Sequence, residues 1–238
     1  MLVDVNASFA RSSGGIAADL PNDARARAAE KIGITMHIVP RAHDAIEQRR
    51  AASIRICAEI DPLSFSGPEA EFDEGAMRRA IAGAAGTPGV VAIELGWPHT
   101  VFGSVKRGAL VEACAAQRVP LRTDDRAAIT PLAAAHPDTS FVLSALGDDP
   151  YWETTLESVA ALANVAVDIS GARTERGMLD RALAVLGPER LLWGTGSQME
   201  TGLAQLRALD VIAPGADVIE AIRWKNAFRV FPRLADPA

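Results

Sequence analysis

The sequence predicts a single (β/α)8 TIM barrel that comprises residues 1–238. Strand and helix patterns alternate eight times along the chain, and a chain of 238 residues has the length of one such barrel. Residues 89–95 form an almost continuous apolar run, which is typical of a parallel strand covered on both faces. No linker, charge run or low-complexity segment in the sequence marks a domain boundary.

Each element follows from its own local pattern. Strands are expected where short apolar or alternating runs end at turn residues, and helices where amphipathic runs end at glycine or before proline. The expected strands cover residues 2–8, 34–39, 53–60, 89–95, 119–123, 140–146, 165–170 and 190–194. The expected helices cover residues 24–31, 43–51, 74–85, 108–117, 127–135, 156–163, 178–186, 202–209 and 218–231. Gly33 ends the first helix and Pro40 the second strand.

The first strand, residues 2–8, alternates strictly between apolar and polar residues. Alternation over a strand points successive side chains to opposite faces. It predicts that the apolar set faces the surrounding helices: Val3, Val5 and Ala7. It predicts that the polar set faces the mouth of the barrel: Asp4, Asn6 and Ser8.

Composition limits the location and the partners of the chain. The net charge of −6 argues against nucleic acid or an anionic membrane as a partner. The sequence contains no run of 18 apolar residues and no signal-peptide pattern, so we expect a cytoplasmic protein that does not span a membrane. Cys57 and Cys114 lack the spacing of a metal site, and we expect both to be small buried residues.

Ionisable residues fall at the ends of several predicted strands, where the active sites of such barrels lie. The carboxylates expected at the mouth belong to Asp4, Glu59, Glu94, Asp124 and Asp168. Arg122 is the clearest counter-charge. Crowded carboxylates repel one another, which raises the pKa of at least one and suits a general acid. The alternative is that some of them pair with Arg122 or Arg55, or accept backbone N–H bonds, and only tie the barrel together.

Several segments match one family in the right order. Residues 136–147 read HPDTSFVLSALG, residues 187–196 read GPERLLWGTG, and residues 226–231 read NAFRVF. Together with Asp4, with the VPL of residues 119–121 and with the DISG of residues 168–171, they resemble the amidohydrolase-related metal-dependent hydrolases. The resemblance covers both ends and the second half of the chain, and it too implies a TIM barrel.

That resemblance implies a metal, usually zinc, held by histidines on strands one, five and six and by an aspartate on strand eight. Here those positions carry Asn6, Ser8, Asp124, Ala145 and Gly196. A catalytic zinc site needs about three N, O or S ligands. We therefore expect a diverged member that has lost the metal site, and we expect no cofactor.

Three functions remain open at this stage. The first is a metal-independent hydrolase or decarboxylase of a small carboxylated or carbonyl substrate, in which Arg122 holds a carboxylate and Asp124 or Asp4 moves a proton. The candidate substrate-binding residues are Asn6, Ser8, Glu94, Trp97 and Asp168. The second is a non-catalytic pseudoenzyme that binds a ligand or a partner protein. The third is a metal enzyme whose ligands are drawn from Asp4, His37, Glu59 or Asp124.

The expected partner is a small molecule, and the resemblance makes a homodimer a candidate assembly. The sequence names neither the substrate nor the oligomeric state.

Overall fold

The structure is a computed structural model. It describes residues 1–7, 29–39, 54–60, 65, 72–95, 104–171, 177–196, 199–212 and 215–236. The predicted helix 43–51 and most of the predicted helix 24–31 lie outside these residues, as do Ser8 and Trp97.

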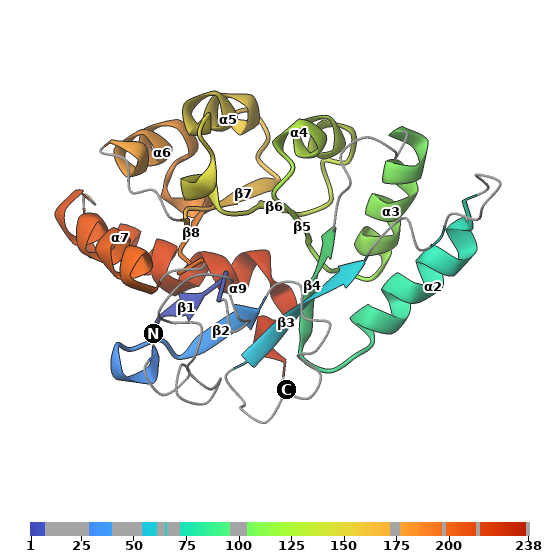
Figure 1. The fold of residues 1–238 in the computed structure, drawn as a ribbon, viewed down its shortest axis with the longest axis horizontal. Helices are drawn as coiled ribbons and strands as arrows, with labels where there is room; N and C mark the ends of the chain where they lie inside the picture. The colour runs from blue at the N-terminus through green and yellow to red at the C-terminus, as the bar shows by residue number, and fades with distance from the viewer. Residues whose placement is uncertain are drawn as a thin grey trace.

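Eight parallel strands form one sheet in the order β1 to β8 (Figure 1). They are β1 Val3–Asp4, β2 Met36–Val39, β3 Ile54–Ile60, β4 Val90–Leu95, β5 Leu121–Thr123, β6 Phe141–Leu143, β7 Val165–Asp168 and β8 Leu191–Leu192. An isolated parallel bridge between Ala7 and Gly196 brings β8 back to β1, and the Val5 N–H donates to the Trp193 carbonyl over 3.1 Å. The predicted TIM barrel is confirmed.

Helices α2 to α7 form an arc outside the strands (Figure 1). They are α2 Glu74–Ala85, α3 Ser104–Ala116, α4 Arg126–Ala135, α5 Trp152–Val159, α6 Met178–Leu186 and α7 Met199–Ile212. Three short helical turns, Leu146–Asp148, Pro188–Arg190 and Pro232–Ala235, lie between or after them. Within the described ranges, none of the helices reaches the length and hydropathy needed to cross a membrane.

The core has two layers, because alternate residues of each strand face opposite sides. Phe141, Val165 and Leu191 pack in the cluster that includes the apolar faces of α2 to α7. The neighbouring residues Val142, Ala166 and Leu192 pack in a second cluster inside the barrel. The second cluster also contains residues from the C-terminal helices, so these helices close one end of the barrel.

The predicted faces of the first strand were wrong. Val3 and Val5 pack inside the barrel with the second cluster, whereas Leu2 packs against the helix layer. Regular strand structure ends after Asp4, because the chain turns at Val5 and Asn6 and the Asn6 N–H donates to the Asp4 carboxylate over 3.1 Å. Strict alternation therefore does not hold across the segment.

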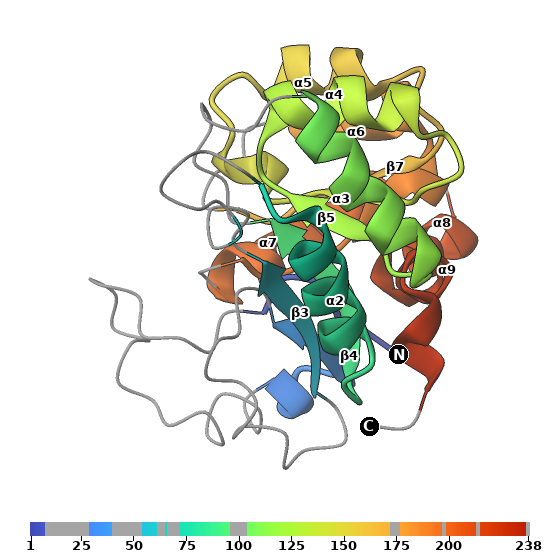
Figure 2. The same ribbon diagram turned by 90° about the vertical axis from the view of Figure 1, so that its right-hand side faces the viewer.

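The C-terminal segment explains the NAFRVF motif. It comprises α8 Ala216–Glu220, a π-helical turn Ala221–Lys225 and α9 Asn226–Val230, which lie toward the same end of the molecule as both termini (Figure 2). The buried Asn226 amide donates to the carbonyls of Pro188 and Leu191 over 2.7 and 2.8 Å. The motif thus fastens this segment to the chain that enters β8.

Replacement of Asn226 by alanine should destabilise the protein by about 1–3 kcal/mol, because two carbonyl groups lose their buried donor. Urea unfolding followed by circular dichroism measures the change. Lys225→Ala, one residue earlier and exposed, is the control and should leave the unfolding midpoint close to that of the wild type. A wild-type midpoint for Asn226→Ala would contradict the structural role of the motif.

Cys57 and Cys114 are free and fully buried, as predicted. Burial raises the pKa of the Cys114 thiol to about 12, and it also raises that of Cys57. Because the thiolate is the reactive form, neither residue should react with a thiol reagent at pH 8 in the folded protein. Absorbance with Ellman's reagent should show two thiols per chain in urea and almost none without it. Rapid labelling of the native protein would show that one of these thiols is accessible.

Candidate functional site

The buried carboxylate of Asp168, at the end of β7, organises the polar interior of the barrel. Its Oδ2 atom accepts hydrogen bonds from Asn6 Nδ2 at 3.0 Å, Ser170 Oγ at 2.8 Å and the Ala145 N–H at 3.1 Å. Its Oδ1 atom accepts the Ser170 N–H at 2.9 Å. Burial raises the pKa of Asp168, although the nearby Arg122 charge and these donors act in the opposite direction. This carboxylate is a structural acceptor that joins β1, β6 and β7.

Arg122 on β5 supplies the positive charge of this interior. Its guanidinium lies 3.6 Å from Glu94 and 3.8 Å from Asp168, and its Nε donates to Ser144 Oγ over 2.6 Å. Burial acts to lower the pKa of Arg122, but the charges of Glu94 and Asp168 and the Cys57 thiol outweigh it and raise that pKa. Arg122 therefore stays charged, and its side chain is only 2% exposed.

Asp4 lies apart from this interior group. Its carboxylate accepts the Thr195 N–H at 2.9 Å and the Thr195 hydroxyl at 2.7 Å, and it lies 3.9 Å from His37 Nδ1. The Thr195 methyl group lies against Gly202 of α7, so this cluster faces the helix layer. The predicted direction of Asp4 was wrong, because its neighbours Val3 and Val5 fill the inside of the barrel and leave Asp4 on the opposite face of β1.

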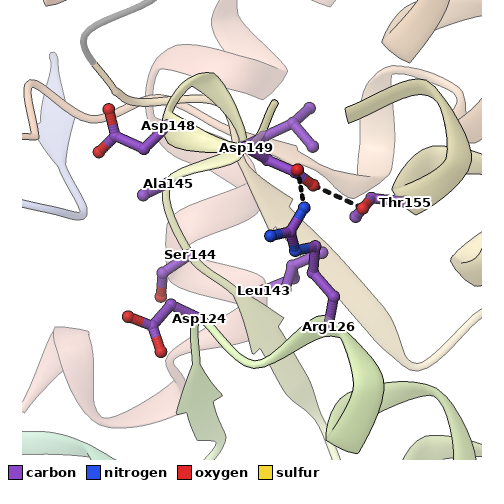
Figure 3. A pocket seen from close by; sticks show the side chains of 9 residues that line it. Asp124, Arg126, Leu143, Ser144, Ala145, Asp148, Asp149 and Thr155 are labelled. Carbon is purple, nitrogen blue, oxygen red and sulfur yellow. Dashed lines mark hydrogen bonds and ion pairs between the residues drawn. The ribbon is translucent and has the colours of Figure 1, made fainter. Parts of the chain in front are cut away.

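The β5 and β6 strands open at their carboxyl ends into a cleft of about 310 Å³ (Figure 3). Its lining residues come from these strands, from the start of α4 and from the turn before α5: Asp124, Arg126, Leu143, Ser144, Ala145, Leu146, Asp148, Asp149 and Thr155. Asp124 lies two residues beyond Arg122 and is exposed where the barrel opens. Asp125 caps α4 by accepting the Ala128 N–H at 3.1 Å, which fixes the backbone between Asp124 and Arg126.

The cleft wall from β6 is held in an uncommon conformation. Ala145 has a φ of +54°, in the left-handed region, and its N–H is bound by Asp168. The next turn packs on β7, where the Gly147 N–H donates to the Ser170 carbonyl over 2.8 Å. A side chain at Gly171 would come within 2.5 Å of the Gly147 and Asp148 backbone, so a glycine is required there. The cleft therefore has a rigid wall.

The structure thus divides the predicted site residues. It places Asp124 in the lining of the cleft. Arg122 lies beneath the cleft and reaches it through a hydrogen bond to Ser144, which is also in the lining. It places Asn6, Glu94 and Asp168 in the buried interior, whereas Glu59 is partly exposed. Ser8 and Trp97 lie outside the described residues.

Sequence reasoning missed the charged residues on the far wall of the cleft. These are Arg126, Asp148 and Asp149. Asp149 is buried and bound by Tyr151 N–H at 2.6 Å and by Thr155 Oγ at 2.5 Å. One feature of the sequence could have indicated Arg126: it begins a helix directly after a strand ends, and residues in such strand-to-helix connections often form the active sites of barrels.

These observations define a (β/α)8 barrel with a candidate site at the carboxyl ends of its strands. The amidohydrolase family model matches residues 2–233, and the chain belongs to this family. None of the curated proteins compared with the sequence matches it.

Solved structures of the same fold are distant in sequence. A 2,6-dihydroxybenzoate decarboxylase from Rhizobium has a TM-score of 0.70 and 15% identity, over 97% of this chain and 98% of that one. An amidohydrolase from Burkholderia multivorans with bound zinc has a TM-score of 0.67 and 16% identity, over 98% and 99%. A 5-carboxyvanillate decarboxylase from Sphingomonas paucimobilis has a TM-score of 0.64 and 15% identity, over 97% and 98%. At this identity the likeness concerns the fold.

The described residues do not fit the metal that the family resemblance implies. The Asn6 amide nitrogen donates to Asp168 and Ser170, Ala145 offers no side-chain donor atom, and a side chain at Gly196 would come within 3.2 Å of the Gly171 nitrogen. Asp124 alone keeps a ligand-type side chain among the described positions. No group of three or more His, Cys, Asp or Glu residues in the described part of the chain could hold a metal ion.

Replacement of Arg122 by methionine should cost about 3–5 kcal/mol, because Glu94 and Asp168 would be left as buried charges without their cation. The exposed Arg78 on α2 pairs with Glu74 and Glu112, and Arg78→Met should cost less than about 1 kcal/mol. Urea unfolding of both variants makes the comparison. Equal losses would mean that the interior charge group contributes no more than a surface ion pair.

Proposed function

We propose that this chain is an enzyme that hydrolyses a small carbonyl substrate in the cleft at the ends of β5 and β6, without the family's metal. The observation that carries the proposal is the 2.6 Å hydrogen bond from buried Arg122 Nε to Ser144 Oγ, next to the exposed carboxylate of Asp124. A cleft of about 310 Å³ is at the lower end of the range for small-molecule sites.

Ser144 takes the role of hydrogen-bond donor in this proposal. Its oxygen accepts a hydrogen bond from a charged guanidinium, so its own proton is directed elsewhere and is a stronger donor. A substrate carbonyl oxygen in the cleft would receive that proton in a hydrogen bond as negative charge develops on it. Arg122 acts through Ser144 and does not contact the substrate.

Asp124 takes the role of general base. Figure 3 shows its carboxylate and the Ser144 hydroxyl on the same side of the cleft. A water molecule between Asp124 and the carbonyl carbon would lose a proton to the carboxylate as its oxygen attacks the carbon. The carbon–leaving-group bond then breaks, and the proton held by Asp124 passes to the leaving group.

Decarboxylation is the second candidate reaction, favoured by the fold likeness to the decarboxylases from Rhizobium and Sphingomonas paucimobilis. In that reaction Asp124 takes the proton of the substrate's carboxylic acid as the carbon–carbon bond breaks and carbon dioxide leaves, and it then returns this proton to the carbon. A non-catalytic ligand-binding protein is the third candidate. It is favoured by the interior network around Asp168, because Asn6 and Ser170 bind that carboxylate directly.

Turnover of lactones, amides and β-keto or aromatic acids tests the proposal. Asp124→Asn should lower kcat/KM by at least about 100-fold, the contribution of a general base. Ser144→Ala should lower kcat more than it raises KM, because the donor acts on charge that develops in the transition state.

Asp138→Asn is the matched control, since Asp138 is exposed and lines a different hollow, beyond the end of α4. Its kcat/KM should equal that of the wild type. Full activity of Asp124→Asn would remove this residue from the mechanism. A compound that binds in the cleft while none of the panel is turned over would support the ligand-binding protein.

A further inference from the structure

Helix α7 is apolar on its outward face as well as on its inward face. Leu206 and Leu209 pack in the core. Ala204, Ala208 and Val211 follow one another at helical spacing on the outside, and Val211 is 84% exposed. A surface helix of a globular protein normally has polar residues opposite its apolar stripe. At one end of the helix arc (Figure 1), α7 therefore carries a second apolar stripe, which this chain leaves exposed.

A hollow of about 510 Å³ adjoins this stripe, between α7, the start of β1 and the residues before β2. Leu2, Ile32, Leu203 and Leu206 give it an apolar lining. Four large apolar side chains are exposed in the part of the chain that the structure describes, and three of them lie at the hollow or on the outer face of α7 beside it: Met1, Ile32 and Val211. Such a concentration of exposed apolar groups is typical of an interaction surface.

Two opposite charges stand at the edge of the hollow, three residues apart on α7. Asp210 accepts a hydrogen bond from Arg223 over 2.6 Å through one oxygen, and its other oxygen lies 4.0 Å from Arg207. Arg207 is 88% exposed and makes no hydrogen bond with the described residues. The guanidinium of Arg207 is therefore available to a second molecule, and Asp210 can accept from it while it keeps its bond to Arg223.

This arrangement is complementary to a second copy of itself. In a two-fold symmetric contact, the same patch meets itself with its residues exchanged. If two α7 helices run antiparallel about an axis beside residues 208 and 209, Arg207 of each copy lies opposite Asp210 of the other. Val211 of each copy then lies opposite Leu206 of the other, which lines the hollow. The small side chains of Ala204 and Ala208 let the two helices approach closely.

We propose that the chain forms a homodimer through this surface, with the two α7 helices antiparallel about a two-fold axis beside Ala208. Two reciprocal ion pairs between Arg207 and Asp210 fix the register, and Val211 covers the apolar hollow of the other copy. The inference does not depend on the proposed function, because the cleft is formed by β5, β6, α4 and the turn before α5.

Sedimentation equilibrium measures the mass. The wild type at about 100 µM should have twice the chain mass of 25.1 kDa. Val211→Glu should weaken the association at least tenfold, because it places a charge in the apolar contact. Tyr151→Glu changes the other large exposed apolar residue and is the matched control, which should remain dimeric. A monomeric wild type, or a Val211→Glu protein as dimeric as the wild type, would overturn the proposal.

Charge exchange tests the two-fold register. Arg207→Glu sets carboxylates opposite each other in the dimer, and Asp210→Arg sets guanidinium groups opposite each other, so each variant alone should be monomeric. In an equimolar mixture of the two variants, every charge meets its opposite, and the mass should return to that of a dimer. Arg181→Glu, at an exposed pair on α6, should remain dimeric alone. A mixture that stays monomeric while both variants are folded contradicts the proposed register.

A cysteine at the axis gives a readout that does not depend on the charge variants. Ala208→Cys should form a disulfide with its own position in the other copy under mild oxidation, and a non-reducing gel should show a covalent dimer. The native Cys57 and Cys114 are buried and do not interfere. Ala161→Cys, at an exposed site after α5, is the control and should stay monomeric on the gel. Equal cross-linking of the two variants would reject α7 as the contact.

Discussion

The buried guanidinium of Arg122 is the charge on which the interior of this barrel depends. Two buried carboxylates, Glu94 on β4 and Asp168 on β7, lie beside this cation and would lose it if Arg122 were replaced. Asp168 in turn binds Asn6 and the Ala145 backbone, so a charge on β5 is coupled to β1 and to the wall of the cleft. The position of the candidate site follows from this interior group.

The fold was predictable because its signals are periodic and repeat along the whole chain. Eight strand–helix units give the barrel even though helix 43–51 lies outside the described residues. The prediction of which side chains point into the barrel failed at the first strand. Its alternation looked regular, but Val3 and Val5 fill the inside of the barrel, so Asp4 faces the helix layer. A hydrogen bond from the Asn6 N–H to the side chain of Asp4 then turns the chain. That bond is a local competition between side chain and backbone, which periodicity does not register.

The site was only partly predictable for a related reason. Strand position placed Asp124 and Arg122 close together, and both lie at the same end of β5. The two residues differ in burial: Arg122 is buried in the interior of the barrel, whereas Asp124, two residues later, is exposed at the cleft. Arg126 and Asp149 meet only because α4 and the turn before α5 lie side by side in space. No pattern within either segment carries that contact.

The segments that resemble the family contain residues that stabilise the barrel. Asn226 fastens the C-terminal helices to the start of β8, and Gly171 lets the β6 turn pack on β7. The changed positions, Asn6, Ala145 and Gly196, cluster where β1, β6 and β8 end. There the Asn6 amide and the Ala145 N–H both bind Asp168, so the residues at these positions serve the hydrogen-bond network inside the barrel.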